Sequence, residues 1–280
     1  MPDDNDSQTL RAVAEELATE AATFVRTRRA EVFGAVPAAG AVQAPSIQTK
    51  SSPTDPVTVV DTETERLLRE RLAERRPGDH VLGEEEGGSA VAAPGEPVWV
   101  IDPIDGTVNF VYGIEAYAVS VGVQIDGVSV AGAVANVATG ELYSGALGHG
   151  ATVTRDGVSS PLRCNAIDDL SLALLGTGFS YESDQRRRQA AVLAALLPEV
   201  RDVRRIGSCA LDLCMVAAGR LDAYFEDGVH VWDWAAGAVI AAEAGAVLRL
   251  PASTSEAQGV LVAAAPGVAA ALDEALARAR

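Results

Sequence analysis

The hydrophobic pattern of the first third of the chain predicts two amphipathic helices separated by a loop. Between residues 10 and 32, apolar side chains recur with the 3.6-residue period of a helix. Residues 34–56 are rich in Gly, Ala, Pro and Ser, which favours an exposed, mobile loop. A second helix is predicted over residues 61–72, with acids in its first turn. The polar residues 1–8 are expected to lack order.

The pattern changes to short apolar runs after the second helix. A buried strand and then an antiparallel meander are predicted over residues 98–101, 118–124, 128–137, 141–144 and 151–154. Strands and helices alternate in the second half. The strands are predicted at 172–175, 203–206, 223–225, 246–250 and 259–264, and the helices at 185–197, 210–218, 233–244 and 267–279. Because the sequence has no internal repeat and no linker, residues 1–280 are expected to form a single domain.

Composition narrows the class of partner. The chain has 22 basic and 39 acidic residues, a net charge of −17, which disfavours nucleic acid and favours cations. Its three cysteines lack the spacing of a zinc ribbon, and their odd number does not suggest a disulfide framework. A reducing cytoplasm therefore fits best. The N-terminus has no signal pattern and no apolar run is long enough for a membrane, so neither secretion nor membrane insertion is expected.

The most informative feature is a strand that ends in two acids, Asp102 and Asp105. Two carboxylates about 4 Å apart repel by about 4 kcal/mol at an effective dielectric near 20, so a cation is expected between them. Pro103 stiffens the predicted turn. Gly106 has no side chain, so a ligand can approach the backbone closely there. Thr107 begins a helical segment whose free amides would bind phosphate. The alternative is that these two acids only cap a helix and a turn.

Two further acids, Glu84 and Asp233, are candidates for the same site because of where they lie in the predicted elements. Glu84 lies in an acidic run that alone is typical of a solvated turn, and Asp233 begins a helix that it could cap. Both nevertheless follow strands or start helices, as Asp102 and Asp105 do, where α/β folds gather ligands. Hard oxygen ligands favour Mg²⁺ or Mn²⁺. The three-residue step from Asp102 to Asp105 differs from the two-residue step of haloacid-dehalogenase phosphatases, which favours a metal-activated water as nucleophile.

These motifs resemble the inositol monophosphatase family. The resemblance lies in residues 83–85, 99–109 and 232–237, and further segments at 51–61, 176–179 and 222–226 follow in the family's order. Among subgroups, the enzymes of actinobacteria are the most similar. The resemblance implies a layered αβαβα sandwich of mixed α+β and α/β class, like that of fructose bisphosphatase, and a homodimer.

The resemblance also implies roles for individual residues. The metal ligands would be Glu84, Asp102, the Ile104 carbonyl, Asp105 and Asp233, holding two or three Mg²⁺ ions, with Mn²⁺ as a substitute. Asp61, Thr107 and Glu84 would be catalytic and would orient or activate the attacking water, and the amides of Gly106 and Thr107 would bind phosphate. The substrate-facing residues would be Asp105, Ser208, Cys209 and Glu226, where Cys209 takes the place of a smaller family residue. Lys50 and Asp55 lie in the loop that helps to place a further metal in the family.

The predicted function is therefore Mg²⁺-dependent hydrolysis of a small phosphorylated polyol, with myo-inositol 1-phosphate favoured and lithium inhibition expected. The same metal residues would serve fructose 1,6-bisphosphate, histidinol phosphate or a 3′-phosphoadenosine nucleotide. Glu226 suits a neutral polyol, while Arg204, Arg205 and Arg220 leave a second phosphate open. A hypothesis of another class is a non-enzymatic interaction protein that retains the fold.

Overall fold

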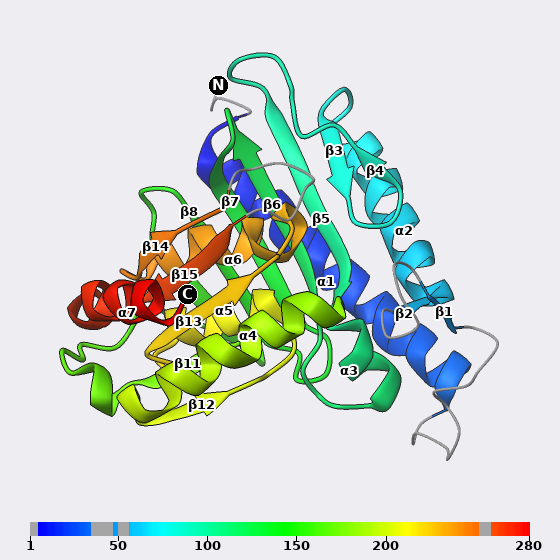
Figure 1. Ribbon diagram of the computed structural model, residues 1–280. Helices are drawn as coiled ribbons and strands as arrows, with labels where there is room; N and C mark the ends of the chain where they lie inside the picture. Colours follow the sequence, from blue (N-terminus) through cyan, green and yellow to red (C-terminus); the bar gives the residue numbers. More distant parts are fainter. Residues whose placement is uncertain (1–4, 35–46, 50–55, 252–258) are drawn as a thin grey trace.

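Helices and sheets alternate through the molecule in five layers (Figure 1). The computed structural model describes residues 5–34, 47–49, 56–251 and 259–280. The outer helices α1 and α2 cover one face of a large sheet, α5 and α6 lie between the two sheets, and α4 and α7 cover the small sheet. These helices are α1 (Ser7–Phe33), α2 (Val59–Arg75), α4 (Ser183–Leu196), α5 (Cys209–Ala217), α6 (Val231–Glu243) and α7 (Pro266–Ala279). The predicted αβαβα order is confirmed.

The large sheet has eight strands in the order β10-β9-β8-β7-β6-β5-β3-β4. Its strands are β3 (His80–Gly83), β4 (Gly87–Gly88), β5 (Pro97–Asp105), β6 (Ala118–Ile125), β7 (Val128–Asn136), β8 (Leu142–Ala146), β9 (Ala151–Arg155) and β10 (Val158–Pro161). Neighbours run antiparallel except β3 and β5, which are parallel and pair Gly83 with Ile101. Because parallel strands end at the same edge of a sheet, this register places Glu84 beside Asp102.

The small sheet has five strands in the order β12-β11-β13-β15-β14. They are β11 (Leu174–Thr177), β12 (Asp202–Arg204), β13 (Ala223–Asp227), β14 (Val247–Arg249) and β15 (Val260–Ala264). The strands β11, β12 and β13 run parallel, while β15 is antiparallel to β13 and to β14. Strand β13 carries Glu226 toward the layer that contains α5 and α6.

Two glycines of the large sheet let α6 approach its strands closely. A Cβ atom on Gly132 of β7 would lie 2.7 Å from the Ala236 Cα, and one on Gly122 of β6 would lie 2.8 Å from the Ala236 nitrogen. The helix backbone therefore rests directly on β6 and β7, with the buried Trp234 and Ala235 beside it. This contact holds α6, and with it Asp233, against the large sheet.

Several helices and strands begin at residues that differ from the predicted ones. Helix α1 begins at Ser7, inside the stretch 1–8 that was expected to lack order, and the Gln8 side chain is 2.8 Å from His149 Nδ1. The strand predicted from Leu172 was wrong there, because residues 170–172 form a 3-10 helix capped by Asp169 and β11 begins two residues later. Among the helices of the described residues, none combines the length and the apolar character that a membrane crossing requires.

A short antiparallel pair of strands lies within and just past the predicted loop 34–56, namely β1 (Ile47–Thr49) and β2 (Pro56–Thr58). Lys50 and Asp55 lie outside the described residues. A second 3-10 helix (Leu197–Glu199) follows α4, and the short α3 (Thr107–Tyr112) follows β5 as predicted. Strands β4 and β10 were not predicted, because neither carries an apolar run.

Candidate active site

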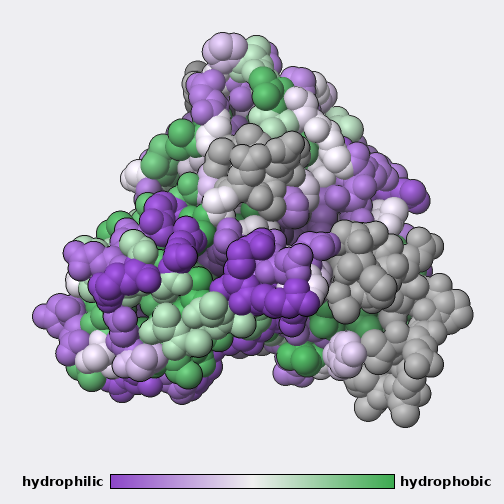
Figure 2. All heavy atoms as spheres, in the orientation of Figure 1, coloured by the Kyte–Doolittle hydropathy of each residue, from purple (hydrophilic) through white to green (hydrophobic). Residues whose placement is uncertain are grey.

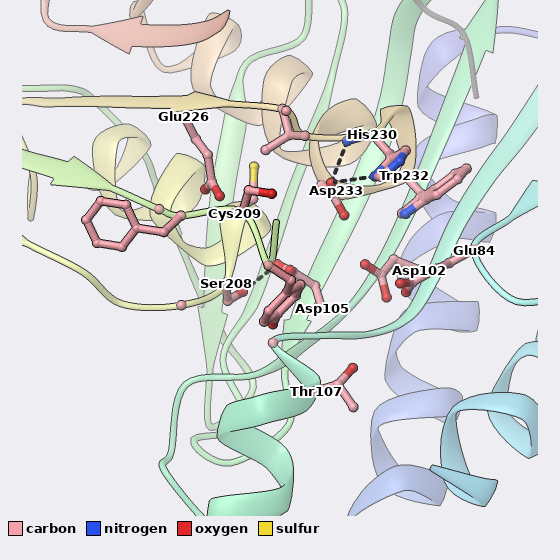
Figure 3. A pocket seen from close by; sticks show the side chains of 18 of the residues that line it. Glu84, Asp102, Asp105, Thr107, Ser208, Cys209, Glu226, His230, Trp232 and Asp233 are labelled. Carbon is pink, nitrogen blue, oxygen red and sulfur yellow. Dashed lines mark hydrogen bonds and ion pairs between the residues drawn. The ribbon is translucent and has the colours of Figure 1, made fainter. Parts of the chain in front are cut away.

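Three carboxylates converge where β5 ends and α6 begins. Carboxylate oxygens of Asp102, Asp105 and Asp233 all lie within 4.8 Å of one another. Figure 3 shows them facing the same hollow, with Glu84 beside Asp102. Asp102 is 2% exposed and Asp105 8% exposed. The structure thus gathers the four predicted metal-binding acids in one place, from three segments far apart in the sequence.

A bulge in β5 lets both of its acids face the cleft. All nine residues of β5 are buried, and its pairing with β6 shifts register between Asp102 and Asp105. In a regular strand, residues three apart point to opposite faces, so the irregularity re-aims one of them. The Ile104 amide donates to Asp102 Oδ1 at 2.9 Å within this bulge. The turn predicted at Pro103 is therefore a continued, bulged strand.

Asp233 both caps a helix and belongs to the cluster. It is the third residue of α6, and its Oδ2 accepts the His230 amide hydrogen at 2.6 Å. The His230 ring stacks on Trp232 with centroids 4.7 Å apart. Asp233 is therefore a helix cap, as the alternative interpretation held, and its carboxylate also lies in the cluster.

The electrostatics of the cluster favour a bound cation. Burial, together with the neighbouring Glu84, Asp105 and Asp233 charges, raises the pKa of Asp102 well above its usual value. Burial, together with the Asp105, Glu84 and Glu226 charges, raises the pKa of Asp233 well above its usual value, although the hydrogen bond from the His230 amide lowers it. Burial raises the pKa of Asp105 to about 7, although hydrogen bonds from Ser208 and Ala210 lower it. Like charges out of water oppose ionisation, and a divalent cation with hard oxygen ligands removes that opposition.

The predicted pair Asp61 and Thr107 is also brought together. The Thr107 hydroxyl oxygen lies 3.0 Å from Asp61 Oδ1 and 3.0 Å from the Ile104 carbonyl oxygen. Asp61 is fully buried, and its Oδ2 accepts the Thr58 amide hydrogen at 3.0 Å, closing the capping box of α2. Thr107 lines the cleft and Asp61 stands behind it. Asp61 therefore reaches the cleft through the Thr107 hydroxyl.

The cleft extends from the carboxylates to β13 and the start of α5. Its volume is about 390 Å³, and its far wall carries Ser208, Cys209 and Glu226 (Figure 3). The Ser208 hydroxyl donates to Asp105 Oδ2 at 2.5 Å, so Asp105 joins the two walls. Gly106, with φ of 92°, lets the chain turn from β5 into α3 at the cleft floor.

The mouth of the cleft is polar. Figure 2 shows hydrophilic side chains near the centre of this face, over the start of α4. The lining residues there are Ser180, Tyr181, Glu182 and Gln185. Arg205 also lines the cleft, whereas Arg204 pairs with Asp202 and Arg220 pairs with Glu141.

Sequence reasoning missed one residue that supports the site. Glu65 of α2 is fully buried, and its carboxylate accepts the amide hydrogens of Glu85 at 2.7 Å and of Glu86 at 2.9 Å. A Cβ on Gly83 would lie 2.3 Å from Glu65 Oε1, so only glycine leaves room for this contact. Nothing in the local pattern separates Glu65 from the other helical acids. It holds the turn that presents Glu84.

The layered fold and the buried carboxylates at its centre are those of a phosphatase that depends on a divalent metal. The profile of the inositol monophosphatase family matches residues 6–280, and the chain belongs to this family. The Inositol-1-monophosphatase of Mycobacterium leprae is 65% identical over 280 residues, which cover 98% of this chain and 96% of that protein.

Two further relatives widen the comparison. The solved structure of Mycobacterium tuberculosis SuhB has a TM-score of 0.83 and 57% identity and covers 99% of each chain. The Nus factor SuhB of Vibrio cholerae is 39% identical over 201 residues, covering 71% of this chain and 73% of that protein. The expected family, its actinobacterial subgroup and the fold are confirmed.

Proposed function

We propose that this chain hydrolyses myo-inositol 1-phosphate to myo-inositol and phosphate and that it requires Mg²⁺. The observation that carries the proposal is the carboxylate cluster of Asp102, Asp105 and Asp233, set at one end of a cleft whose other end carries groups suited to hydroxyls. The mycobacterial relatives named inositol-1-monophosphatase support the choice of substrate.

The donor set fits a hard divalent cation. Glu84, Asp102, Asp105 and Asp233 offer carboxylate oxygens and Ile104 a carbonyl oxygen. Burial and mutual repulsion raise the pKa of Asp102 and of Asp233, and a bound cation would relieve that repulsion. We propose that these groups hold two or three Mg²⁺ ions, with Mn²⁺ as a substitute. Such ions, when bound, would lower the pKa of water and offset the charge of the phosphoryl group.

The chain's own residues would aim the reactants. Asp61 is acceptor-only when ionised, so the Thr107 hydroxyl hydrogen can point to it and leave the Thr107 oxygen free to accept a hydrogen from the attacking water. Glu84, beside Asp102, would assist in activating that water. The Gly106 and Thr107 amides would bind phosphate oxygens, because they lie at the turn into α3 on the cleft floor.

The far wall of the cleft favours a neutral polyol. Asp105, Ser208, Cys209 and Glu226 would face the leaving alcohol, and carboxylates accept hydrogen bonds from hydroxyls. A second phosphate would be repelled by the Glu226 carboxylate. Of Arg204, Arg205 and Arg220, only Arg205 lines the cleft and could offset that repulsion. This balance supports inositol 1-phosphate over fructose 1,6-bisphosphate.

A panel of phosphate monoesters tests the proposal. Phosphate release is measured with Mg²⁺ from myo-inositol 1-phosphate, fructose 1,6-bisphosphate, histidinol phosphate and a 3′-phosphoadenosine nucleotide. We expect the highest kcat/KM on the inositol ester, no turnover in excess chelator, and inhibition by lithium. Faster hydrolysis of another ester would overturn the substrate, and undiminished release in chelator would overturn the metal requirement.

A second candidate is a non-enzymatic interaction role, because two relatives bear the name Nus factor SuhB. A panel without turnover in saturating Mg²⁺ would favour it. The net charge of −17 argues against direct nucleic-acid binding in either case. We also propose that the protein is a homodimer, as the family resemblance implies, and light scattering behind a sizing column would test this.

A further inference from the structure

The carboxylate of Glu226 is held from two sides. The buried Tyr224, two residues earlier on β13, donates its hydroxyl hydrogen to Glu226 Oε2. On the other side lies Gly178, where a Cβ atom would be 2.0 Å from Oε2 and 2.3 Å from Oε1. The carboxylate therefore lies flat against the Gly178 backbone, in a space that any larger residue would fill.

The Tyr224 hydroxyl can serve this role because it stays protonated. Burial raises the pKa of Tyr224 well above its usual value, so the hydroxyl keeps its hydrogen. A tyrosine has one hydroxyl hydrogen, and Tyr224 gives it to Glu226.

We propose that Tyr224 is a positioning residue for substrate specificity: it anchors Oε2 of Glu226 and leaves Oε1 as the acceptor for a ring hydroxyl of the polyol. Gly178 provides the room for this orientation. The inference rests on the proposed function, in which Glu226 faces the leaving alcohol. Without the anchor, a glutamate side chain has several rotatable bonds and must give up rotamer freedom when it binds.

The first test is Tyr224→Phe, which removes one hydroxyl from a buried ring. We expect KM for myo-inositol 1-phosphate to rise about tenfold, the effect of losing a hydrogen bond to a charged group, while kcat stays within about twofold. The inhibition constant of inorganic phosphate, which has no ring hydroxyls, should not change. Tyr143→Phe is the matched control, because Tyr143 of β8 is also buried and donates to a glutamate, Glu141.

Gly178→Ala is a second, independent variant. The three atoms nearest to its new Cβ all belong to the flexible end of Glu226, so that side chain can move aside and the protein should fold with a melting temperature close to that of the wild type. KM for the inositol ester should rise again, with the phosphate inhibition constant unchanged.

Parallel rises of KM and of the phosphate inhibition constant would show that Tyr224 only supports the fold, and an unchanged KM in both variants would also overturn the inference. A wild type that hydrolyses no inositol ester would instead refute the proposed function. The comparison would then be made on binding of the ester in Mg²⁺, measured by thermal shift, where equal shifts in wild type and Tyr224→Phe refute the positioning role.

Discussion

Replacing Glu65 with glutamine should weaken metal binding from a position outside the cleft. The two oxygens of Glu65 accept the Glu85 and Glu86 amide hydrogens and also bind Arg69 at 2.8 Å. These contacts hold the turn that follows Gly83, and Glu84 is the residue of that turn that faces Asp102 (Figure 3). Glutamine keeps one acceptor oxygen and turns an NH₂ group toward the second amide.

The magnitude follows from the lost contact. A hydrogen bond to a charged group contributes about 1.5–3 kcal/mol, and a buried amide that faces another donor loses its partner entirely. If that cost is relieved by movement of the turn, Glu84 leaves its place beside Asp102. The dissociation constant for Mg²⁺ should then rise by about 10- to 150-fold, since about 1.4 kcal/mol corresponds to a factor of ten.

The assay is calorimetric titration of the metal-free protein with Mg²⁺, with Glu63→Gln as the control. Glu63 lies on the same helix and pairs with Arg28 at the surface, so its loss should leave the Mg²⁺ affinity unchanged. A Glu65→Gln variant that folds and binds Mg²⁺ as tightly as the wild type would refute the reasoning.

Three other predictions concern charge. Asp102→Asn should lower kcat by at least about 100-fold, while Glu85→Ala should cost less than about threefold because alanine keeps the amide that binds Glu65; equal losses would contradict this ranking. Since burial raises the pKa of Asp105 to about 7, the metal-free native state binds more protons than the unfolded chain and loses stability as pH rises from about 4 to 7. The gain in melting temperature from saturating Mg²⁺ should therefore be larger at pH 8 than at pH 5, and an equal gain would count against it. Burial raises the pKa of Glu141, but hydrogen bonds from Arg220, Tyr143 and Arg155 lower it to about 2 overall, so its stabilisation is present above about pH 4.5 and is lost as pH falls toward 2. Glu141→Gln should cost about 1–2 kcal/mol at pH 7 after allowance for solvent screening, and urea unfolding should show less than half of that difference at pH 3.

The sequence predicted the elements well wherever apolar periodicity is strong. Helices α1, α5, α6 and α7 and the strands of the meander all lie within a few residues of their predicted bounds. The weak points were segments without such a pattern, among them the 3-10 helix at 170–172 and the strand pair β1 and β2. The single domain and the mobility of residues 34–56 stay predictions.

The acids of the site were predictable because each follows a buried strand or starts a helix. The way in which these acids come together in space was not predictable from the sequence. The bulge between Asp102 and Asp105 depends on pairing with β6, and the role of Glu65 depends on a turn 20 residues away. Tyr224 and Glu226 lie on the same strand, β13, but the orientation of the Glu226 carboxylate also depends on Gly178, which follows the neighbouring strand β11. Such contacts between distant segments leave no local pattern.

Anomalous diffraction from a crystal soaked in Mn²⁺ tests the central claim most directly, namely that these carboxylates gather in order to hold divalent metal. The account predicts at least one anomalous peak within about 2.0–2.2 Å of oxygens from Asp102, Asp105 and Asp233. A crystal saturated with Mn²⁺ that shows no peak among these three side chains would contradict it.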